Sequence, residues 1–170
     1  MATVLLRTQQ QHLSIQLKGN LMLSIRPATI NDIAQLAQLF DAYRQFYEQT
    51  PDILTAHEFI TERINKQESV ILVAEDAKQQ LIGFCQIYPS FCSVITAKIG
   101  VLYDLFVDKN ERGNGAGKAL MLAAHEYASN NQFARLDLST AKANQVAQAL
   151  YESLGWVRDD VFYTYSKNIT

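Results

Sequence analysis

Short apolar runs bounded by polar or turn-forming residues predict a series of β-strands. They lie at residues 23–26, 69–75, 80–89, 98–108, 133–140 and 161–167. The run at 98–108 is almost continuously apolar, so we expect that strand to be buried on both faces. Leu13, Ile15 and Leu17 alternate with polar residues, which indicates one further short strand in an N-terminal extension of residues 1–21.

Apolar residues at helical spacing predict four helices between these strands. The first follows the capping box Thr29-x-x-Asp32, and the second is expected to begin at Thr55-x-x-Glu58 and to run to about Asn65. A third helix follows a glycine-rich loop near residue 115. The fourth has Asn144 as its expected N-cap and Gly155 beyond its C-terminal end. Strands and helices in this order are typical of a mixed α/β fold.

Length, composition and charge favour a single domain and exclude several classes of partner. The chain has 170 residues, 48 % of them hydrophobic, which suits one domain at residues 22–170. The net charge of −2 argues against a nucleic-acid partner. No apolar run reaches the length of a membrane span and the N-terminus lacks a secretory pattern, so we expect no membrane partner and a cytoplasmic location. The two cysteines and three histidines lack metal-ligand spacing, so no metal is expected.

The glycine-rich loop at residues 112–118 carries the most informative chemical signal. Its sequence, Arg-Gly-Asn-Gly-Ala-Gly-Lys, follows a strand and precedes a helix. Glycines permit tight turns and leave the backbone amides uncovered, and the first N–H groups of a helix attract anions. The loop therefore predicts a phosphate site. A Walker A loop does not fit, because Arg112 and Ala119 stand where that motif needs Gly and Ser or Thr, and a dinucleotide fingerprint fails as well.

The segment ERGNGAGKAL resembles the pyrophosphate-binding signature of the GNAT superfamily, Arg/Gln-x-x-Gly-x-Gly/Ala, through Arg112, Gly115 and Gly117. DLFVDKN resembles the strand that this family places before the loop, and NQVAQALYESLGW resembles its later helix. The resemblance runs from about Ser24 to Ser166. It implies a twisted mixed central sheet of about six or seven strands flanked by about four helices.

The resemblance also implies acetyl-CoA as co-substrate, with its pantetheine arm between two splayed parallel strands, Val101–Asp108 and Arg135–Ser139. Backbone amides of the loop would bind the pyrophosphate, and the end of the preceding strand would hydrogen-bond the acetyl carbonyl and the pantetheine. For Asn144 a plain N-cap is an equal alternative. The implied cofactor-binding residues are Leu105, Phe106, Val107, Arg112, Gly113, Asn114, Gly115, Ala116, Gly117, Lys118 and Asn144.

Two residues are candidates for the catalytic chemistry. Tyr151 matches the family's tyrosine near the cofactor sulfur, and we expect it to hydrogen-bond the leaving thiolate, since full proton transfer would be uphill by about 2 kcal/mol. Asp104 interrupts an apolar strand, and a buried carboxylate is costly unless it is paired or functional. Asp104 is therefore a candidate base or amine-positioning charge. The alternatives are a core tyrosine for Tyr151, and for Asp104 a carboxylate bonded to a tyrosine or a backbone N–H.

The expected function is acetyl transfer from acetyl-CoA to a primary amine of a small molecule, such as an amino acid or polyamine, by direct attack in a ternary complex. A non-catalytic acetyl-CoA-binding sensor and an acetyltransferase of protein N-termini or lysines are the alternatives. A homodimer through the terminal strands is a further hypothesis. Candidate acceptor-binding residues are Tyr43, Arg44, Tyr47, Glu48, Tyr88, Tyr163 and Tyr165.

Overall fold

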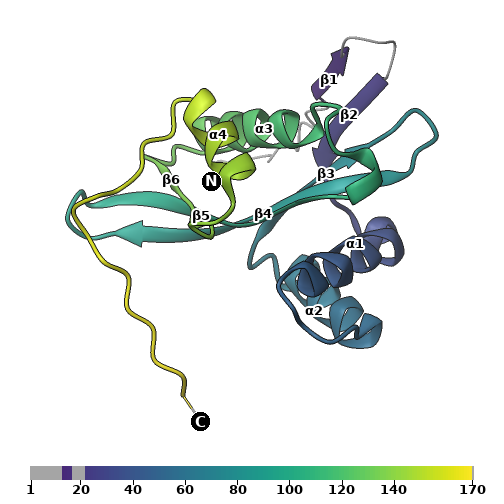
Figure 1. Ribbon diagram of the computed structural model, residues 1–170, viewed down its shortest axis with the longest axis horizontal. Helices are drawn as coiled ribbons and strands as arrows, with labels where there is room; N and C mark the ends of the chain where they lie inside the picture. The colour runs from purple at the N-terminus through teal and green to yellow at the C-terminus, as the bar shows by residue number, and fades with distance from the viewer. Residues whose placement is uncertain (1–12, 17–21, 170) are drawn as a thin grey trace, which may run out of the picture. The chain divides into compact units, whose positions relative to one another are not determined.

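The computed structural model describes residues 13–16 and 22–169, which fall into two compact units divided after Leu138. The first unit holds one six-stranded sheet whose spatial order, β1 to β6, follows the chain (Figure 1). All neighbouring strands are antiparallel except β5 and β6, which are parallel. The strands are β1 (Leu13–Gln16), β2 (Met22–Pro27), β3 (Val70–Glu75), β4 (Leu81–Cys92), β5 (Ala97–Val107) and β6 (Leu136–Asp137).

Helices cover both faces of this sheet. In the first unit, α1 (Ile33–Phe46) and α2 (Ile53–Lys66) lie on one face and α3 (Ala116–Asn130) lies on the other (Figure 1). Two 3-10 turns, η1 (Ile30–Asp32) and η2 (Lys109–Glu111), precede α1 and α3. The mixed α/β fold with about six strands is confirmed, as is the short strand predicted near Leu13, although Leu17 lies outside the described residues.

The two helix starts predicted from capping boxes have different outcomes. Asp32 accepts hydrogen bonds from the Thr29 N–H (2.7 Å) and hydroxyl (2.9 Å), as predicted. The start of α2 at Thr55 was wrong, because Asp52 caps this helix instead. The Asp52 carboxylate accepts from the Thr55 N–H (3.0 Å) and hydroxyl (2.7 Å), so the first helical residue is Ile53. Aspartate is one of the strongest N-cap residues, and here it caps the helix three residues before the threonine.

The apolar core between the sheet and α1–α2 is built from aliphatic and aromatic side chains. Burying each of the valine, leucine, isoleucine and phenylalanine side chains contributes roughly 1.5–3 kcal/mol to the free energy of unfolding. Its buried members are Ile33, Leu36, Leu39, Phe40, Ala56, Ile60, Ile71, Val73, Leu81, Phe84 and Phe106. On the other face, Leu120 of α3 is fully buried and its carbonyl lies 3.9 Å from the Cys85 thiol. This core fixes α1 and α3 on opposite sides of β4 and β5.

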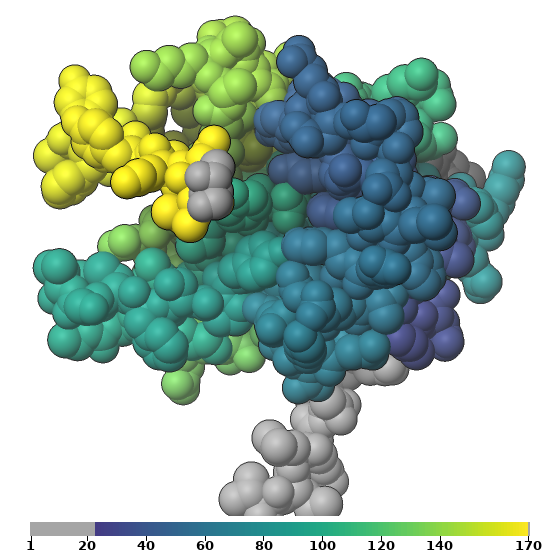
Figure 2. All heavy atoms as spheres, turned by 90° about the horizontal axis from the view of Figure 1, so that it is seen from below, coloured from purple at the N-terminus to yellow at the C-terminus, as the bar shows by residue number. Residues whose placement is uncertain are grey.

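β5 departs from the prediction that it is buried on both faces. Leu102, Asp104 and Phe106 are buried, whereas Tyr103 is 69 % exposed. From the side of α1 and α2, shown in Figure 2, these helices cover part of the sheet and the hairpin of β4 and β5 extends beyond them. Helices on both faces thus leave one side of β5 uncovered along part of its length.

The second unit contains α4 (Gln145–Ser153) and an extended C-terminal segment. The Asn144 side chain accepts from the Ala147 N–H (3.2 Å) and Gly155 adopts φ +83°, so both predicted helix ends are confirmed. The strand predicted at 161–167 is wrong, since no strand occurs between residues 157 and 169. Asp159 instead accepts hydrogen bonds from the N–H groups of Val161 and Phe162, and such local bonds compete with strand pairing.

Candidate functional site

β5 changes its hydrogen-bonding partners halfway along its length. β6 pairs with it only at Gly100–Leu136 and Val101–Asp137. Beyond Val101, as far as residues are described, β5 is paired with β4 alone. β6 has only two residues, so the strand predicted at 133–140 is much shorter than expected, and one edge of β5 beyond Val101 carries backbone N–H and C=O groups that no described strand uses. Leu105, Phe106 and Val107, the predicted partners of acetyl-CoA on this strand, lie along that edge.

A β-bulge interrupts β5 next to the free edge. Gln86 of β4 is opposite Asp104, whereas the following residue, Ile87, is opposite Leu102. Tyr103 is therefore the extra residue of the bulge. Bulges bend a strand and change the direction of its side chains, and they are frequent beside active sites. The bulge could not be predicted from the sequence of β5, because a bulge depends on how β5 pairs with β4.

The glycine-rich loop brings together all seven of its predicted residues between η2 and the first turn of α3. Gly113 and Gly115 adopt φ values of +83° and +82°, which glycine tolerates best. Gly115 is the N-cap of α3, and its carbonyl accepts from the Ala119 N–H (2.9 Å). The first N–H groups of a helix have no partner within it, and the helix dipole is positive at this end. The loop can therefore hold an anion such as a phosphate.

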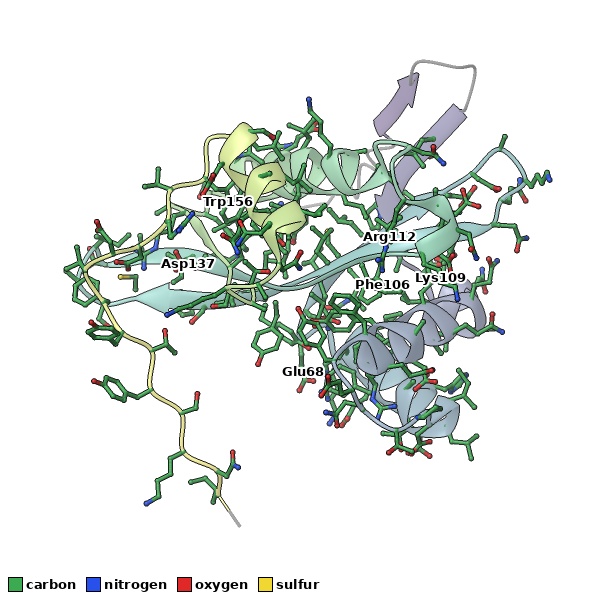
Figure 3. The ribbon with its side chains drawn as sticks, in the orientation of Figure 1. Glu68, Phe106, Lys109, Arg112, Asp137 and Trp156 are labelled. Carbon is green, nitrogen blue, oxygen red and sulfur yellow. The ribbon has the colours of Figure 1, made fainter. Side chains whose placement is uncertain are left out.

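The side chain of Arg112 holds this loop against the end of β5. Its Nε donates to the Val107 carbonyl (3.0 Å). Its guanidinium carbon lies 5.6 Å from the ring centre of Phe106 and 5.7 Å from that of Phe46 on α1. Figure 3 shows Arg112 beside Phe106. Arg112 thus connects the loop, the strand and α1.

Asp104 is a buried carboxyl group without a compensating cation. It is 5 % exposed, and no ion pair joins it to a described Lys, Arg or His. Burial raises its pKa to about 6, although the Tyr43 hydroxyl, acting as a hydrogen-bond donor, opposes part of that increase. At neutral pH the group is mostly ionised and still basic enough to accept a proton, which suits general-base chemistry.

Aromatic side chains surround this carboxyl group. Tyr43 packs its ring against Phe84 (5.9 Å between centroids) and Phe106 (6.1 Å), so it serves the core as well as Asp104. Burial, followed by the charge of Asp104, raises the pKa of Tyr88 to about 12. The Tyr88 ring meets that of Tyr103 edge to face at 6.0 Å. The structure therefore brings the predicted residues Tyr43, Tyr88 and Asp104 together.

Gln86 is a component of this cluster that the sequence interpretation missed. It is fully buried in β4 and is the Cα partner of Asp104. The signal that could have identified it is the one that identified Asp104, a polar residue inside an apolar strand. Tyr103 was missed as well, since its position depends on the bulge.

Other predicted acceptor-binding residues have different surroundings. The Arg44 guanidinium is paired with Asp41 (2.7 Å), which links the end of α1 to the start of α2 through the Asp52 N–H. Tyr47 contacts the Tyr43 ring at 5.1 Å and is 45 % exposed, and Glu48 is exposed at the end of α1. The charge of Arg44 is thus balanced within the protein.

Four predicted residues belong to the second unit. Tyr163 and Tyr165 are exposed and lie on no strand. Tyr151 is half-buried with its ring 6.3 Å from that of Trp156, and Asn144 caps α4. The cofactor roles of Tyr151 and Asn144 stay predictions.

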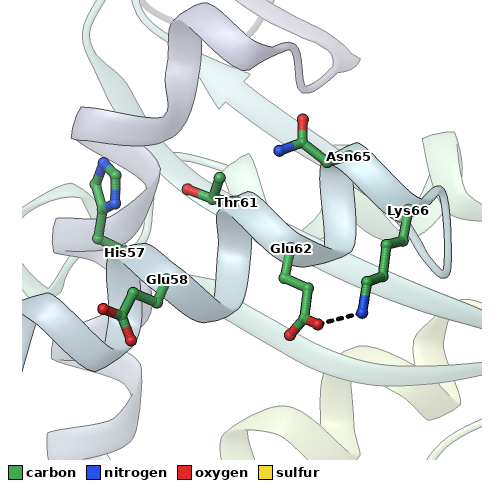
Figure 4. Close-up of a pocket in the computed structure, with 6 residues that line it drawn as sticks. All are labelled: His57, Glu58, Thr61, Glu62, Asn65 and Lys66. Atoms are coloured by element: carbon green, nitrogen blue, oxygen red, sulfur yellow. Dashed lines mark hydrogen bonds and ion pairs between the residues drawn. The ribbon is translucent and has the colours of Figure 1, made fainter.

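A separate depression lies on the outer surface of α2 (Figure 4). It is open, comes from a single helix, and contains the ion pair between Glu62 and Lys66. Its lining residues are His57, Glu58, Thr61, Glu62, Asn65 and Lys66. We assign no chemistry to it. In the described part of the chain, no group of three His, Cys, Asp or Glu side chains could hold a metal ion, and no helix is long and apolar enough to cross a membrane.

Comparison with known proteins gives a consistent result. Residues 34–156 match the Acetyltransferase (GNAT) family. The chain is 42 % identical over 147 residues to an uncharacterized N-acetyltransferase, YhfO, of Bacillus subtilis, covering 86 % of this chain and 98 % of that protein. It is 30 % identical over 125 residues to a probable acetyltransferase of Haemophilus influenzae, covering 74 % and 84 %.

A solved structure supports the same relationship. The crystal structure of a probable acetyltransferase superposes with a TM-score of 0.81 at 35 % identity, over 86 % of this chain and 97 % of that one. Its mixed α/β fold agrees with the sheet and helices described above. The protein belongs to the GNAT family and is an N-acetyltransferase.

Proposed function

We propose that the protein transfers the acetyl group of acetyl-CoA to the primary amine of a small molecule, by direct attack in a ternary complex. The observation that carries this proposal is the position of Asp104. This buried carboxyl group, which forms no ion pair with a described Lys, Arg or His, stands beside a bulge on the strand that leads to the anion-binding loop. One strand thereby joins a base for an amine to a binding site for a phosphorylated donor.

The chain's residues fit acetyl-CoA in two respects. The loop offers uncovered amides and a helix N-terminus, which suit the pyrophosphate. The free edge of β5 from Leu102 to Val107 offers backbone donors and acceptors of the kind that the amides of a pantetheine arm need. Leu105, Phe106 and Val107 are the proposed contacts there, with a backbone N–H polarising the thioester carbonyl.

In the proposed reaction one residue acts on the attacking amine and another on the leaving sulfur. The amine nitrogen attacks the thioester carbonyl carbon, a C–N bond forms, and the C–S bond breaks with its electron pair leaving on sulfur. The proton lost by the amine passes to Asp104, whose pKa of about 6 leaves it ionised at neutral pH. Tyr151 is proposed to donate a hydrogen bond to the leaving sulfur. Products are an amide and coenzyme A, whose thiolate then takes up a proton.

The surroundings of Asp104 favour a small, positively charged acceptor. Tyrosine rings and one carboxylate attract an ammonium group through charge and cation–π contacts. Arg44 is already neutralised by Asp41, so it offers little additional attraction for an acidic acceptor. Tyr43, Tyr47 and Tyr88 are the proposed contacts. A simple aliphatic or arylalkyl amine, which is protonated at neutral pH, satisfies this chemistry without an acidic group.

Calorimetric titration with acetyl-CoA tests the donor site, using Gly117→Glu and the matched neutral variant Gly117→Gln. A carboxylate placed near the phosphates repels them, so we expect the Glu variant to bind at least about 10-fold more weakly than the Gln variant. Equal affinities in the two variants would remove the loop as the phosphate site. Coenzyme A release with a panel of primary amines then separates an enzyme from a sensor that binds without turnover.

A further inference from the structure

Gln86 carries a buried hydrogen-bond acceptor that the protein leaves unused. Its side-chain nitrogen donates to the Ser69 hydroxyl (2.7 Å) and to the Tyr88 hydroxyl (2.9 Å). Its side-chain oxygen, Oε1, is buried and has no hydrogen-bond partner among the residues that the structure describes. Buried polar atoms are almost always paired, because leaving one unpaired costs free energy. An unpaired oxygen held in place by two hydroxyls is therefore a candidate contact for a ligand.

The position of Gln86 places its side chain on the same face of the sheet as the candidate base. Gln86 and Asp104 are directly opposed on neighbouring antiparallel strands, so their side chains leave the sheet on the same face, with Cβ atoms about 5 Å apart. Asp104 has Tyr43 as its hydrogen-bonding neighbour and no paired cation among the described residues. Two acceptor groups thus face one region of the α1 side of the sheet.

We propose that Gln86 positions the amine of the acceptor substrate by accepting a hydrogen bond from it at Oε1, while Asp104 accepts a second. This inference rests on the proposed function and specifies its substrate class. A primary ammonium has three N–H donors and satisfies both oxygens, whereas a quaternary ammonium has none. The site should therefore select primary amines by hydrogen bonding, although tyrosine rings alone would accept a quaternary ammonium equally well.

Hydrogen bonds to Ser69 and Tyr88 fix the direction of the Gln86 amide. A fixed oxygen binds an amine with less loss of side-chain freedom than a mobile one. Ser69 immediately precedes β3 and Tyr88 lies two residues along β4, so neither partner depends on the substrate. Gln86 is a positioning residue in this proposal, and proton transfer stays with Asp104.

The test compares Gln86→Met and Gln86→Glu with the wild type, using n-butylamine, tyramine and spermidine as acceptors with saturating acetyl-CoA. Methionine keeps the size but removes the oxygen, so we expect kcat/KM to fall about 10- to 100-fold, mainly through KM. Glutamate keeps an acceptor oxygen, and both hydroxyl partners can donate to it, so its KM should stay within a few-fold of wild type. If Gln86→Met keeps the wild-type KM for these amines, Oε1 does not contact the substrate and the proposal would be overturned.

The quaternary analogue of tyramine, with its amine replaced by trimethylammonium, adds a binding readout. As an inhibitor of the wild type it should bind at least about 10-fold more weakly than tyramine, and Gln86→Met should reduce that difference. Equal binding of the two compounds to the wild type would overturn the proposal, because it would show recognition by the tyrosine rings alone.

Cys85→Ala is the matched control, because Cys85 is the buried neighbour of Gln86 and approaches α3 on the opposite face. It should leave the amine KM unchanged, and thermal melting should show both variants folded. If Gln86→Met does not fold, Ser69→Ala removes one of the two bonds that orient the amide and should raise the amine KM several-fold. An active wild type, with an unchanged amine KM in folded Gln86→Met and Ser69→Ala, would overturn this inference alone. A wild type that binds acetyl-CoA but acetylates no amine would overturn the proposed function, and this inference with it.

Discussion

Asp32 and Asp104 are buried to the same degree, at 6 % and 5 % exposure, but their surroundings differ. Asp32 accepts two hydrogen bonds of 2.8 Å from the Arg26 guanidinium and further bonds from Thr29. Asp104 has a tyrosine hydroxyl as its hydrogen-bonding neighbour and no ion pair with any described cation. One carboxylate joins the start of α1 to the sheet, and the other has no described ion-pair partner.

The pKa values follow from this difference. Burial raises the pKa of both groups, and for Asp32 it is the largest single influence. The hydrogen bonds from Arg26 and Thr29 together outweigh it, so the pKa of Asp32 is below its ordinary value. The pKa of Asp104 stays near 6 because the hydroxyl of Tyr43 offsets only part of the burial. Burial alone thus does not single out a candidate base, whereas burial without an ion pair to a described cation makes Asp104 one.

Asp104→Asn should produce the largest effect, because it removes the base but hardly changes the shape. We expect kcat/KM to fall about 100- to 10,000-fold, the range of general-base catalysis. In the wild type, kcat/KM should rise with pH through about 6 as Asp104 ionises, and that dependence should be lost in the variant. Initial rates from pH 5 to 9 provide the measurement. An unchanged rate and profile would show that Asp104 is not the base.

The same variant should gain stability while it loses activity. A carboxyl group whose pKa is higher in the folded state than in the unfolded state favours folding when protonated. Its contribution is present below the unfolded value of 3.8 and is lost as pH rises through about 6. At pH 8, Asp104→Asn should therefore raise the free energy of unfolding by about 3 kcal/mol, and at pH 4 the gain should be much smaller. Urea unfolding at the two pH values measures the difference.

Asp32→Asn should have the opposite effect on stability. It breaks a partly buried ion pair, although Arg26 keeps its second partner, Glu75, so the free energy of unfolding should fall by about 2 kcal/mol at pH 7. The pKa of Asp32 is lowered on folding, so its contribution is present above the unfolded value and is lost as pH falls below it. Turnover should keep the wild-type pH profile. A changed profile would mean that the two carboxylates are coupled.

Tyr43→Phe should change kcat/KM least among these variants. It tests how much the Tyr43 hydroxyl lowers the pKa of Asp104. The variant retains the ring contacts with Phe84 and Phe106 but loses the hydroxyl that opposes the increase in the Asp104 pKa. That pKa should therefore rise further, and the acidic limb of the kcat/KM profile should move to higher pH, with a modest loss of rate at pH 7. A shift to lower pH would contradict the described interaction. Tyr127→Phe, on α3 against Phe133, is the control.

Features that depend on the conformation of a few consecutive residues could be predicted from the sequence. Left-handed glycines followed by a helix have a short-range signature, and so do the Thr29 capping box and the Asn144 cap. A carboxylate within an apolar strand was equally visible, which is why Asp104 was identified in advance.

Features that depend on distant partners were missed or mistaken. The bulge at Tyr103 arises from pairing with β4, and the unused oxygen of Gln86 is evident only once Ser69 and Tyr88 are placed beside it. Likewise, alternation at 161–167 indicated a strand, but a strand also needs a neighbour, and Asp159 supplies local hydrogen bonds instead.

The free edge of β5 also has a consequence for handling the protein. Unpaired strand edges can associate with one another between molecules, which leads to aggregation during concentration or storage. A ligand that occupies this edge would protect it and would also stabilise the fold, by about 2.7 kcal/mol at 100 times its dissociation constant. Preparations kept with coenzyme A should therefore remain monodisperse at concentrations where ligand-free samples become turbid.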